Sequence, residues 1–282
     1  MSGMAYILTI VIGWLLAVGG HSIGEALAVE QSFQDQPYPV ITVIENMEAA
    51  GEALYYAASS GKADVVIRLL KLGVPANAHA VDGVATALYA VACNNSSPDS
   101  PQIARALLDW GADPNAVQDR SGEMPLHCAA TVNNLAVAEV LLEHGANPNA
   151  KNENEATPVY YAVLSRHREF VELLVHSGAN INVLNKSGIS PLRSAVNSSN
   201  RTMTELLLSL GARVNDRDEF GAAPLHWAAR AGHADLVEVM LAHGAAVDVT
   251  DGYGRTPCEL AQNPEVIALL NAASACVKGK QR

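Results

Sequence analysis

The chain has 282 residues, of which 49% are hydrophobic but only 5% aromatic, and its formal net charge is −11. This acidic balance argues against a nucleic-acid partner, because affinity for phosphate backbones comes largely from Lys and Arg. A low aromatic content with abundant alanine suits tightly stacked short helices better than a large globular core.

An uncharged apolar run occupies residues 6–20, close to the N-terminus. It has the length of a signal-peptide core and is short for a membrane span, which needs about 20 apolar residues. Ala26-Leu27-Ala28 follows as an A-x-A cleavage site, although no Lys or Arg precedes the run. We therefore expect residues 1–28 to be a cleaved export signal and the mature, periplasmic or secreted chain to begin at Val29. The alternatives are a membrane anchor over residues 6–20 and a misread start codon upstream of a cytosolic protein.

The segments that flank the centre of the chain are polar or ambiguous. Residues 29–50 form a linker and lead-in: residues 29–40 are polar with two prolines, and residues 41–50 suit either a capping helix or an extended segment. Residues 273–282 form a basic tail that we expect to be disordered. The remaining segment, residues 51–272, is expected to fold.

Within that segment, proline and glycine recur with a fixed step of 33 residues. The prolines are Pro125, Pro158, Pro191, Pro224 and Pro257, and the glycines are Gly145, Gly178, Gly211 and Gly244. A fixed period of this size indicates an array of structural repeats.

The unit over residues 218–249 is the most regular. A turn leads to a first helix predicted over Pro224–Arg230, Gly232 interrupts it, and a second helix is predicted over Ala234–Ala242. Proline at a helix start and glycine just past a helix end are the expected punctuation. Isolated helices of this length are marginal in water, so each unit needs its neighbours.

Each proline lies in one recurring pattern, which reads MPLHCAA, TPVYYAV, SPLRSAV, APLHWAA and TPCELAQ, and the second helices close on HGANPNA, SGANINV, LGARVND and HGAAVDV. These segments resemble the ankyrin repeat family, whose unit is a β-turn and two antiparallel helices with a T-P-L-H-x-A signature. The resemblance implies an all-α solenoid of about seven helix-turn-helix repeats with short β-turn fingers over residues 51–272. With the export signal, it implies a bacterial type of ankyrin protein.

Several repeats depart from the pattern. The first lacks its Thr-Pro opening, as expected for a terminal repeat, and the second carries an insertion of roughly four residues after Cys93. Glu155 stands where a turn glycine is usual, and Arg193 replaces the signature His. The last repeat has a short second helix, predicted over Glu265–Ala272, and serves as the C-terminal cap.

The four cysteines, Cys93, Cys128, Cys258 and Cys276, have no C-x-x-C spacing, so a zinc site is not expected. Cys93 and Cys128 fall on the first helices of adjacent repeats, about one turn apart along the axis. Since neighbouring helices lie about 8–10 Å apart, we expect these Cα atoms to be beyond disulfide reach. Cys258 and Cys276 could pair within the last repeat, but the favoured interpretation of all four is as small buried side chains.

Histidines are the tempting catalytic candidates. His127 and His226 occupy the fourth position of the signature, where the resemblance implies that the imidazole hydrogen-bonds the turn backbone between repeats. The sequence has no metalloprotease, nucleophile-elbow, P-loop or dinucleotide-binding motif. Equivalent histidines on adjacent repeats lie too far apart to share a zinc ion. We therefore expect no enzymatic activity, no cofactor and no metal.

The resemblance implies that the turns project as fingers and that the first helices line a concave face. Two positions at each fingertip are not needed for the fold: Arg120-Ser121, Glu153-Asn154, Lys186-Ser187, Glu219-Phe220 and Gly252-Tyr253. Exposed aromatic residues on rigid turns anchor interfaces, although both could instead pack against their own neighbours. Trp227 is expected in the core. The predicted partner-binding residues are Phe220, Tyr253, Glu219, Arg230, Arg255, Lys186, Arg120 and Glu153.

The sequence thus predicts a scaffold that binds another protein and no nucleic acid, with membrane contact only if the N-terminal segment stays uncleaved. Some bacterial ankyrin-like proteins with signal peptides are linked to oxidative-stress enzymes such as catalase, so the resemblance implies support of such an enzyme as one role. The alternatives are a secreted effector that engages host proteins and, less favoured, an enzyme or small-ligand binder. The partner cannot be read from the sequence, because fold does not carry function.

Overall fold

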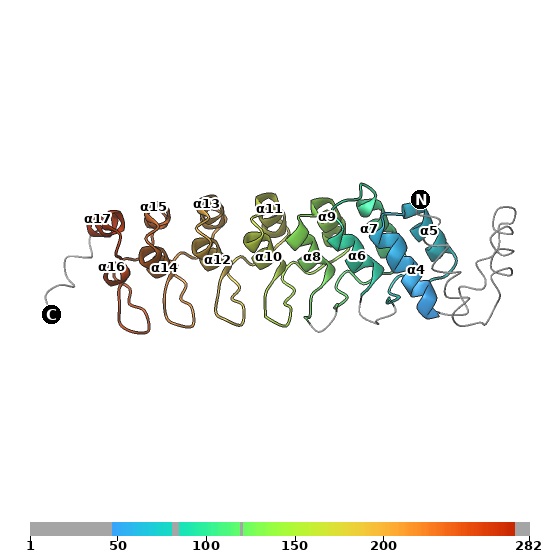
Figure 1. The fold of residues 1–282 in the computed structure, drawn as a ribbon, viewed down its shortest axis with the longest axis horizontal. Coiled ribbons are helices and arrows are strands. Elements are labelled where there is room, and N and C mark those ends of the chain that lie inside the picture. Colours follow the sequence, from blue (N-terminus) through green and yellow to red (C-terminus); the bar gives the residue numbers. More distant parts are fainter. Residues whose placement is uncertain (1–46, 81–84, 119–120, 274–282) are drawn as a thin grey trace, which may run out of the picture.

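The computed structural model describes residues 47–80, 85–118 and 121–273. This part of the chain forms seven pairs of helices stacked side by side in one elongated row (Figure 1). It contains no strand, only isolated bridges between His79 and Thr86 and between Gln118 and Glu123. The predicted all-α solenoid is confirmed. The predicted signal peptide, residues 29–46 and residues 274–282 lie outside the described residues.

The helices form two layers. The first helices of the repeats, which lie next to the fingers in Figure 1, are α4 (Met47–Ser59), α6 (Ala87–Cys93), α8 (Pro125–Val132), α10 (Pro158–Leu164), α12 (Pro191–Asn197), α14 (Pro224–Ala231) and α16 (Pro257–Leu260). The second helices are α5 (Ala63–Lys71), α7 (Ser100–Asp109), α9 (Leu135–Glu143), α11 (Arg168–His176), α13 (Arg201–Ser209), α15 (Ala234–Ala242) and α17 (Pro264–Ala272). None of these helices is long and apolar enough to cross a membrane.

The prolines and glycines that the sequence places at helix ends set the helix bounds. Ala223 is extended, Pro224 begins α14, and Gly232 ends it in the left-handed conformation with φ 77°. The predicted bounds of α15 are confirmed, and those of α14 and α17 are correct to within one residue. Residues 47–50, for which the sequence left two options, belong to helix α4.

The core runs continuously through the stack. Each first helix packs against the first helices beside it and against the second helix of its own repeat. Fully buried alanines such as Ala92, Ala129, Ala162 and Ala228 let the first helices approach closely. Phe170 is the bulkiest fully buried side chain in the described part of the chain. Because every repeat shares its apolar surface with its neighbours, burial of that surface stabilises the array as a whole rather than any single unit.

A ladder of asparagines joins the repeats at the ends of the second helices. Each asparagine donates its Nδ2 to a glycine carbonyl of the next repeat, at 2.9–3.4 Å, and its Oδ1 accepts a backbone N–H two residues beyond that glycine. The asparagines are Asn77, Asn115, Asn149, Asn182 and Asn215, and the glycines are Gly111, Gly145, Gly178, Gly211 and Gly244. The ladder satisfies helix-end carbonyls that would otherwise lack a partner.

The cysteine prediction was wrong. Cys93 and Cys128 form a disulfide between α6 and α8, with their Cα atoms 5.2 Å apart. The error lay in equating the distance between helix axes with that between Cα atoms. Each Cα lies about 2.3 Å from its axis, so facing residues of helices about 8–10 Å apart come within disulfide reach. Cys258 is also disulfide-bonded, and Cys276 lies outside the described residues.

The insertion in the second repeat is the loop over residues 94–99, between α6 and α7. Its side chains bridge three repeats, because Asn94 Nδ2 donates to Ser59 O at 2.7 Å and Asn95 Nδ2 donates to Val132 O at 2.8 Å. The insertion therefore strengthens the junction of the second and third repeats, which the Cys93–Cys128 disulfide joins covalently, and also the junction of the first and second.

Candidate partner-binding face

The fingers are the turns between a second helix and the next first helix; the four most regular are residues 152–156, 185–189, 218–222 and 251–255. All project from the same side of the stack, next to the first helices (Figure 1). We use finger face for the surface made by these fingers and the adjoining sides of the first helices α4 to α16. Seven of the eight predicted contact residues are described, and Arg120 lies outside the described residues.

Each regular finger is held rigid by one Asn or Asp at its start. Its Oδ1 accepts two backbone N–H groups, two and four residues further on, at 2.8–3.0 Å. These residues are Asn152, Asn185, Asp218 and Asp251. Neighbouring fingers are also linked through their backbones, as where Gly252 N donates to Phe220 O at 2.8 Å. The fingertip side chains therefore stand on a pre-ordered backbone.

The two predicted aromatic anchors are exposed. Tyr253 is 73% exposed and Phe220 is 45% exposed. The Phe220 ring packs edge-on against Trp227, with centroids 6.5 Å apart, and the Arg255 guanidinium lies 4.8 Å from the Tyr253 ring. Tyr253 is the more accessible of the two to a partner, since Trp227 covers part of the Phe220 ring.

Trp227 is the centre of a cluster on α12 and α14. Its indole Nε1 donates to Asp218 Oδ2 at 2.8 Å, and the same oxygen lies 2.8 Å from Arg193 Nη1. The guanidinium groups of Arg193 and Arg230 lie over the indole ring at 4.3 and 5.8 Å from its centroid. The Arg193 and Asp218 side chains are only 9% and 2% exposed. Trp227 packs partly against the core, as expected, but also presents a half-buried ring to the finger face.

The last finger is braced by its own ion pair. Arg255 donates from Nε and Nη2 to Asp251 Oδ2, at 3.0 and 2.8 Å. Burial alone would raise the pKa of Asp251, but the hydrogen bonds from the Arg255 side chain and the finger backbone lower it to about 2. The Asp251 carboxylate therefore stays charged and keeps the finger that carries Tyr253 in place.

A second polar cluster joins three repeats near the other end of the finger face. Tyr161 Oη donates to Glu123 Oε1 at 2.9 Å, and Tyr89 Oη donates to Glu123 Oε2 at 3.1 Å. Asn152 Nδ2 donates to Tyr161 Oη at 2.9 Å. Burial, reinforced by the hydrogen bond to Glu123 and by its charge, raises the pKa of Tyr161 to about 12. No Lys or Arg in the described part of the chain pairs with Glu123.

The signature histidines brace the turns, as the resemblance implied. His127 Nδ1 accepts the Met124 N–H at 3.2 Å, and its Nε2 lies 3.1 Å from the carbonyls of Ala150 and Ala156. His226 makes the equivalent contacts with Ala223 N and Arg255 O. Burial lowers the pKa of both histidines, so each is neutral at pH 7 and its Nε2 carries the donated proton.

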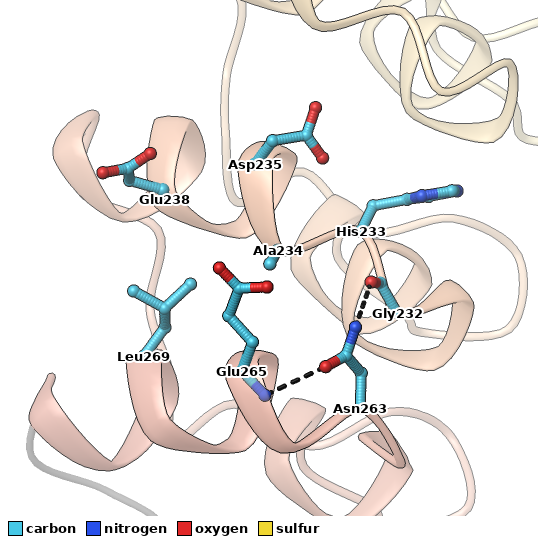
Figure 2. Close-up of a pocket in the computed structure, with 8 residues that line it drawn as sticks. All are labelled: Gly232, His233, Ala234, Asp235, Glu238, Asn263, Glu265 and Leu269. Atoms are coloured by element: carbon cyan, nitrogen blue, oxygen red, sulfur yellow. Dashed lines mark hydrogen bonds between the residues drawn. The ribbon is translucent and has the colours of Figure 1, made fainter.

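A surface pocket lies elsewhere, between α15 and α17. It measures about 400 Å³ and is lined by Gly232, His233, Ala234, Asp235, Glu238, Asn263, Glu265 and Leu269. The three carboxylates point in different directions (Figure 2). No group of three or more His, Cys, Asp or Glu in residues 47–80, 85–118 and 121–273 could hold a metal ion. This pocket therefore has no convergent chemistry, and the predicted absence of catalysis stays a prediction.

Comparison with protein-family models decides the family. Models of ankyrin repeats match residues 92–185, 148–218 and 207–261, which together cover well over half of the chain. The chain belongs to the ankyrin repeat family. Its ankyrin repeats therefore place it among folds that serve as protein-interaction scaffolds.

Known ankyrin-repeat proteins resemble it over part of their length. The neurogenic locus notch homolog protein 1 of Danio rerio is 52% identical over 54 residues, which are 19% of this chain and 2% of that protein. The Homo sapiens protein of the same name is 31% identical over 177 residues, which are 51% of this chain and 7% of that protein. Among solved structures, the ankyrin repeat domain of Bcl-3 superposes with a TM-score of 0.73 at 29% identity, covering 78% of this chain and 97% of that domain.

The sequence analysis missed both clusters because each depends on residues from different repeats. A comparison of the ankyrin repeats position by position could have found them. Tyr161 and Trp227 occupy the same position on first helices two repeats apart, and Glu123 and Arg255 occupy the same finger position with opposite charge. A repeat position whose charge differs from one repeat to another can therefore be recognised in the sequence and indicates such a cluster.

Proposed function

We propose that this protein is an exported ankyrin-repeat scaffold that binds a protein partner across its finger face. The observation that carries the proposal is the exposure of Tyr253 and Phe220 on consecutive fingers whose backbones are hydrogen-bonded to each other. Rigid aromatic anchors lose little entropy on binding, and they dominate many interfaces. The charged fingertips of Glu153, Lys186 and Glu219 lie in the same row of fingers and contribute to specificity more than to affinity.

The disulfides support the export part of the proposal. Cys93–Cys128 joins adjacent repeats, and Cys258 is disulfide-bonded as well. Disulfides persist in oxidising compartments and are rare in the cytosol of mesophiles. The disulfides thus favour the same compartment as the apolar run at residues 6–20 and the Ala26-Leu27-Ala28 cleavage site.

Partner binding is tested with the mature chain, which begins at Val29, as bait in a cross-linking experiment on the exported fraction. The Phe220→Ala/Tyr253→Ala double variant should lose the cross-linked protein. The matched control is Trp110→Ala, because Trp110 is 51% exposed but lies at the end of a second helix, away from the fingers. If the double variant still cross-links the same protein in full, Phe220 and Tyr253 do not anchor the interface.

Export is tested by intact mass and cell fractionation. A chain starting at Val29 in the periplasmic or secreted fraction is the expected result. A full-length chain in the membrane fraction would make residues 6–20 an anchor, and a full-length chain in the cytosol would refute export.

A further inference from the structure

The finger face carries opposite charge at its two ends, and this asymmetry limits the kind of partner that fits it. The Glu123 cluster lies on the second to fourth repeats, and the Trp227 cluster lies on the fifth and sixth. The inference drawn from them rests on the proposed function, because it names the chemistry of the protein segment that the same face would bind.

At the negative end, Glu123 is a half-buried carboxylate that pairs with no Lys or Arg of residues 47–80, 85–118 and 121–273. Its two oxygens accept hydroxyl protons from Tyr89 and Tyr161, which fix its orientation but do not neutralise its charge. The Tyr161 ring is in turn held edge-on by His127 and Tyr160 at centroid distances of 5.8 and 6.3 Å. A carboxylate bordered by aromatic rings suits a Lys or Arg side chain, which can pair with the charge and pack on the rings.

At the positive end, Arg230 is an exposed guanidinium without a carboxylate. It forms no ion pair with another residue in the described part of the chain, and its only close aromatic neighbour is Trp227, 5.8 Å away. The nearby Asp218 is already neutralised by the buried Arg193, and Asp251 is neutralised by Arg255. Glu219 is the acidic exception at a fingertip. The free charge of this cluster is therefore positive and suits an Asp or Glu side chain.

Between the two ends the first-helix side of the finger face is apolar or neutral, while the fingertips Glu153 and Lys186 carry one charge of each sign. Leu164 is 49% exposed at the end of α10, Ile189 is half-buried on the next finger, and Ser194 occupies the helix position that Tyr161 and Trp227 hold on either side. Exposed leucine at a position flanked by two charged clusters offers a contact for an uncharged side chain. A continuous segment could therefore follow the face from one charge to the other.

The repeat geometry sets the distance between the charges. Glu123 and Arg230 lie three repeats apart along the stack and eight residues apart in position within the repeat. Because neighbouring helices are spaced about 8–10 Å apart and a helix rises about 1.5 Å per residue, the two charges are separated by roughly 30 Å. An extended chain advances about 3.3–3.6 Å per residue. A segment that reaches both charges therefore needs about 8–10 residues between its own two charges.

We propose that the finger face binds an extended segment of a partner protein that places a Lys or Arg on Glu123 and an Asp or Glu on Arg230, about 8–10 residues apart. A nucleic acid does not fit this arrangement, because its phosphates would be repelled by the Glu123 carboxylate. The charge pair fixes the direction and register of the segment, while Phe220 and Tyr253 anchor residues beyond its acidic end.

The test selects binders from a random 14-residue peptide library displayed on phage, with the mature, oxidised protein as target. The enriched peptides should carry a basic and an acidic residue at the proposed spacing. Synthetic peptides of these sequences should bind about tenfold more weakly to Glu123→Gln and to Arg230→Gln. The matched controls are Glu169→Gln and Arg168→Gln, two exposed residues on helix α11 in the outer layer, which should leave binding unchanged.

A second selection reverses one charge. Because Arg230 is exposed, Arg230→Glu should fold, and it should enrich peptides with two basic residues at the same spacing. An absence of enriched peptides, a spacing of only a few residues, or binding unchanged by both Gln variants would overturn the inference. If Phe220→Ala/Tyr253→Ala abolishes binding while the Gln variants do not, the inference fails and the proposed function stands. Binding that survives all of these changes would contradict both.

Discussion

The two halves of the stack are held together by different chemistry. In the second to fourth repeats, the Cys93–Cys128 disulfide, the insertion loop and the hydroxyl groups bound to Glu123 join neighbouring units. In the fifth to seventh repeats, the Arg193–Asp218 ion pair joins the fifth and sixth repeats, and the Arg255–Asp251 ion pair braces the last finger. The fingers at residues 152–156, 185–189, 218–222 and 251–255 are held by the same pair of Oδ1 hydrogen bonds in both halves.

The difference shows how much freedom the repeat leaves to its side chains. Asn152 and Asp218 hold their fingers with the same two Oδ1 hydrogen bonds. Of these two, only Asp218 has a charge left on its second oxygen, and that oxygen pairs with Arg193 of the preceding repeat, where an arginine replaces the signature histidine. A single position can therefore hold its turn and, in addition, carry a charge that the neighbouring repeat must satisfy.

Breaking the ion pair of the C-terminal half should have the largest effect. Arg193→Met leaves the Asp218 carboxylate buried without its cation, and we expect the free energy of unfolding to fall by about 3–5 kcal/mol. Urea unfolding followed by the fluorescence of Trp227 measures the loss. Arg193→His combined with Asp218→Asn removes both charges and restores the residues of the regular repeats, so it should recover most of the stability. If the change in the urea midpoint of Arg193→Met is smaller than the error of that measurement, the ion pair is dispensable for stability.

Removing the disulfide should weaken the N-terminal half alone. The Cys93→Ser/Cys128→Ser double variant is expected to lose about 2–4 kcal/mol. Trp110 reports on this half and Trp227 on the other, so unfolding of single-tryptophan variants should separate the two transitions. A reductant should reproduce the shift in the wild type and have no further effect on the Trp110 signal of the double variant. Equal shifts at both tryptophans would show that the halves unfold as one unit.

Acid should weaken both halves through His127 and His226. Burial lowers the pKa of each imidazole in the folded state, so their contribution is present above the unfolded pKa and is lost as pH falls through and below about 6.5. We expect the urea midpoint to drop between pH 7.5 and 5. The drop should be smaller in His127→Gln/His226→Gln, which cannot titrate at these positions. The same drop in wild type and variant would assign the effect to other groups.

Replacing Glu155 should have the smallest effect and the opposite sign. Glu155 has a φ of 54°, in the left-handed region where the other regular fingers place Gly188, Gly221 and Gly254. Glu155→Gly relieves this strain and loses only the exposed ion pair with Lys151, so the melting temperature should rise by about 1–3 °C. Lys151→Gln isolates the ion pair as a control. A lower melting temperature for Glu155→Gly would show that the side chain contributes more than the strain costs.

The sequence predicted the helices, the fingers and the exposed aromatics because these follow from local rules. Pro224, Gly232 and Gly244 act through their own backbone conformations, and the free fingertip positions of Phe220 and Tyr253 follow from the repeat. The contacts of Glu123 and Arg193 could not be predicted in this way, because each reaches a side chain on another repeat. Cys93 and Cys128 needed the separation of two Cα atoms, which helix spacing alone overestimates.

The asparagine ladder makes the stack directional. Each amide reaches forward to the next repeat, from Asn149 to Gly178 and from Asn182 to Gly211, for example. A whole repeat inserted between two regular ones would offer both the amide and the carbonyl that its neighbours need. An insertion of any other length within the ladder would leave an amide and a carbonyl without partners. The array is therefore built to change length by whole units, and each unit gained would extend the finger face by one finger and one first helix without altering the contacts on either side.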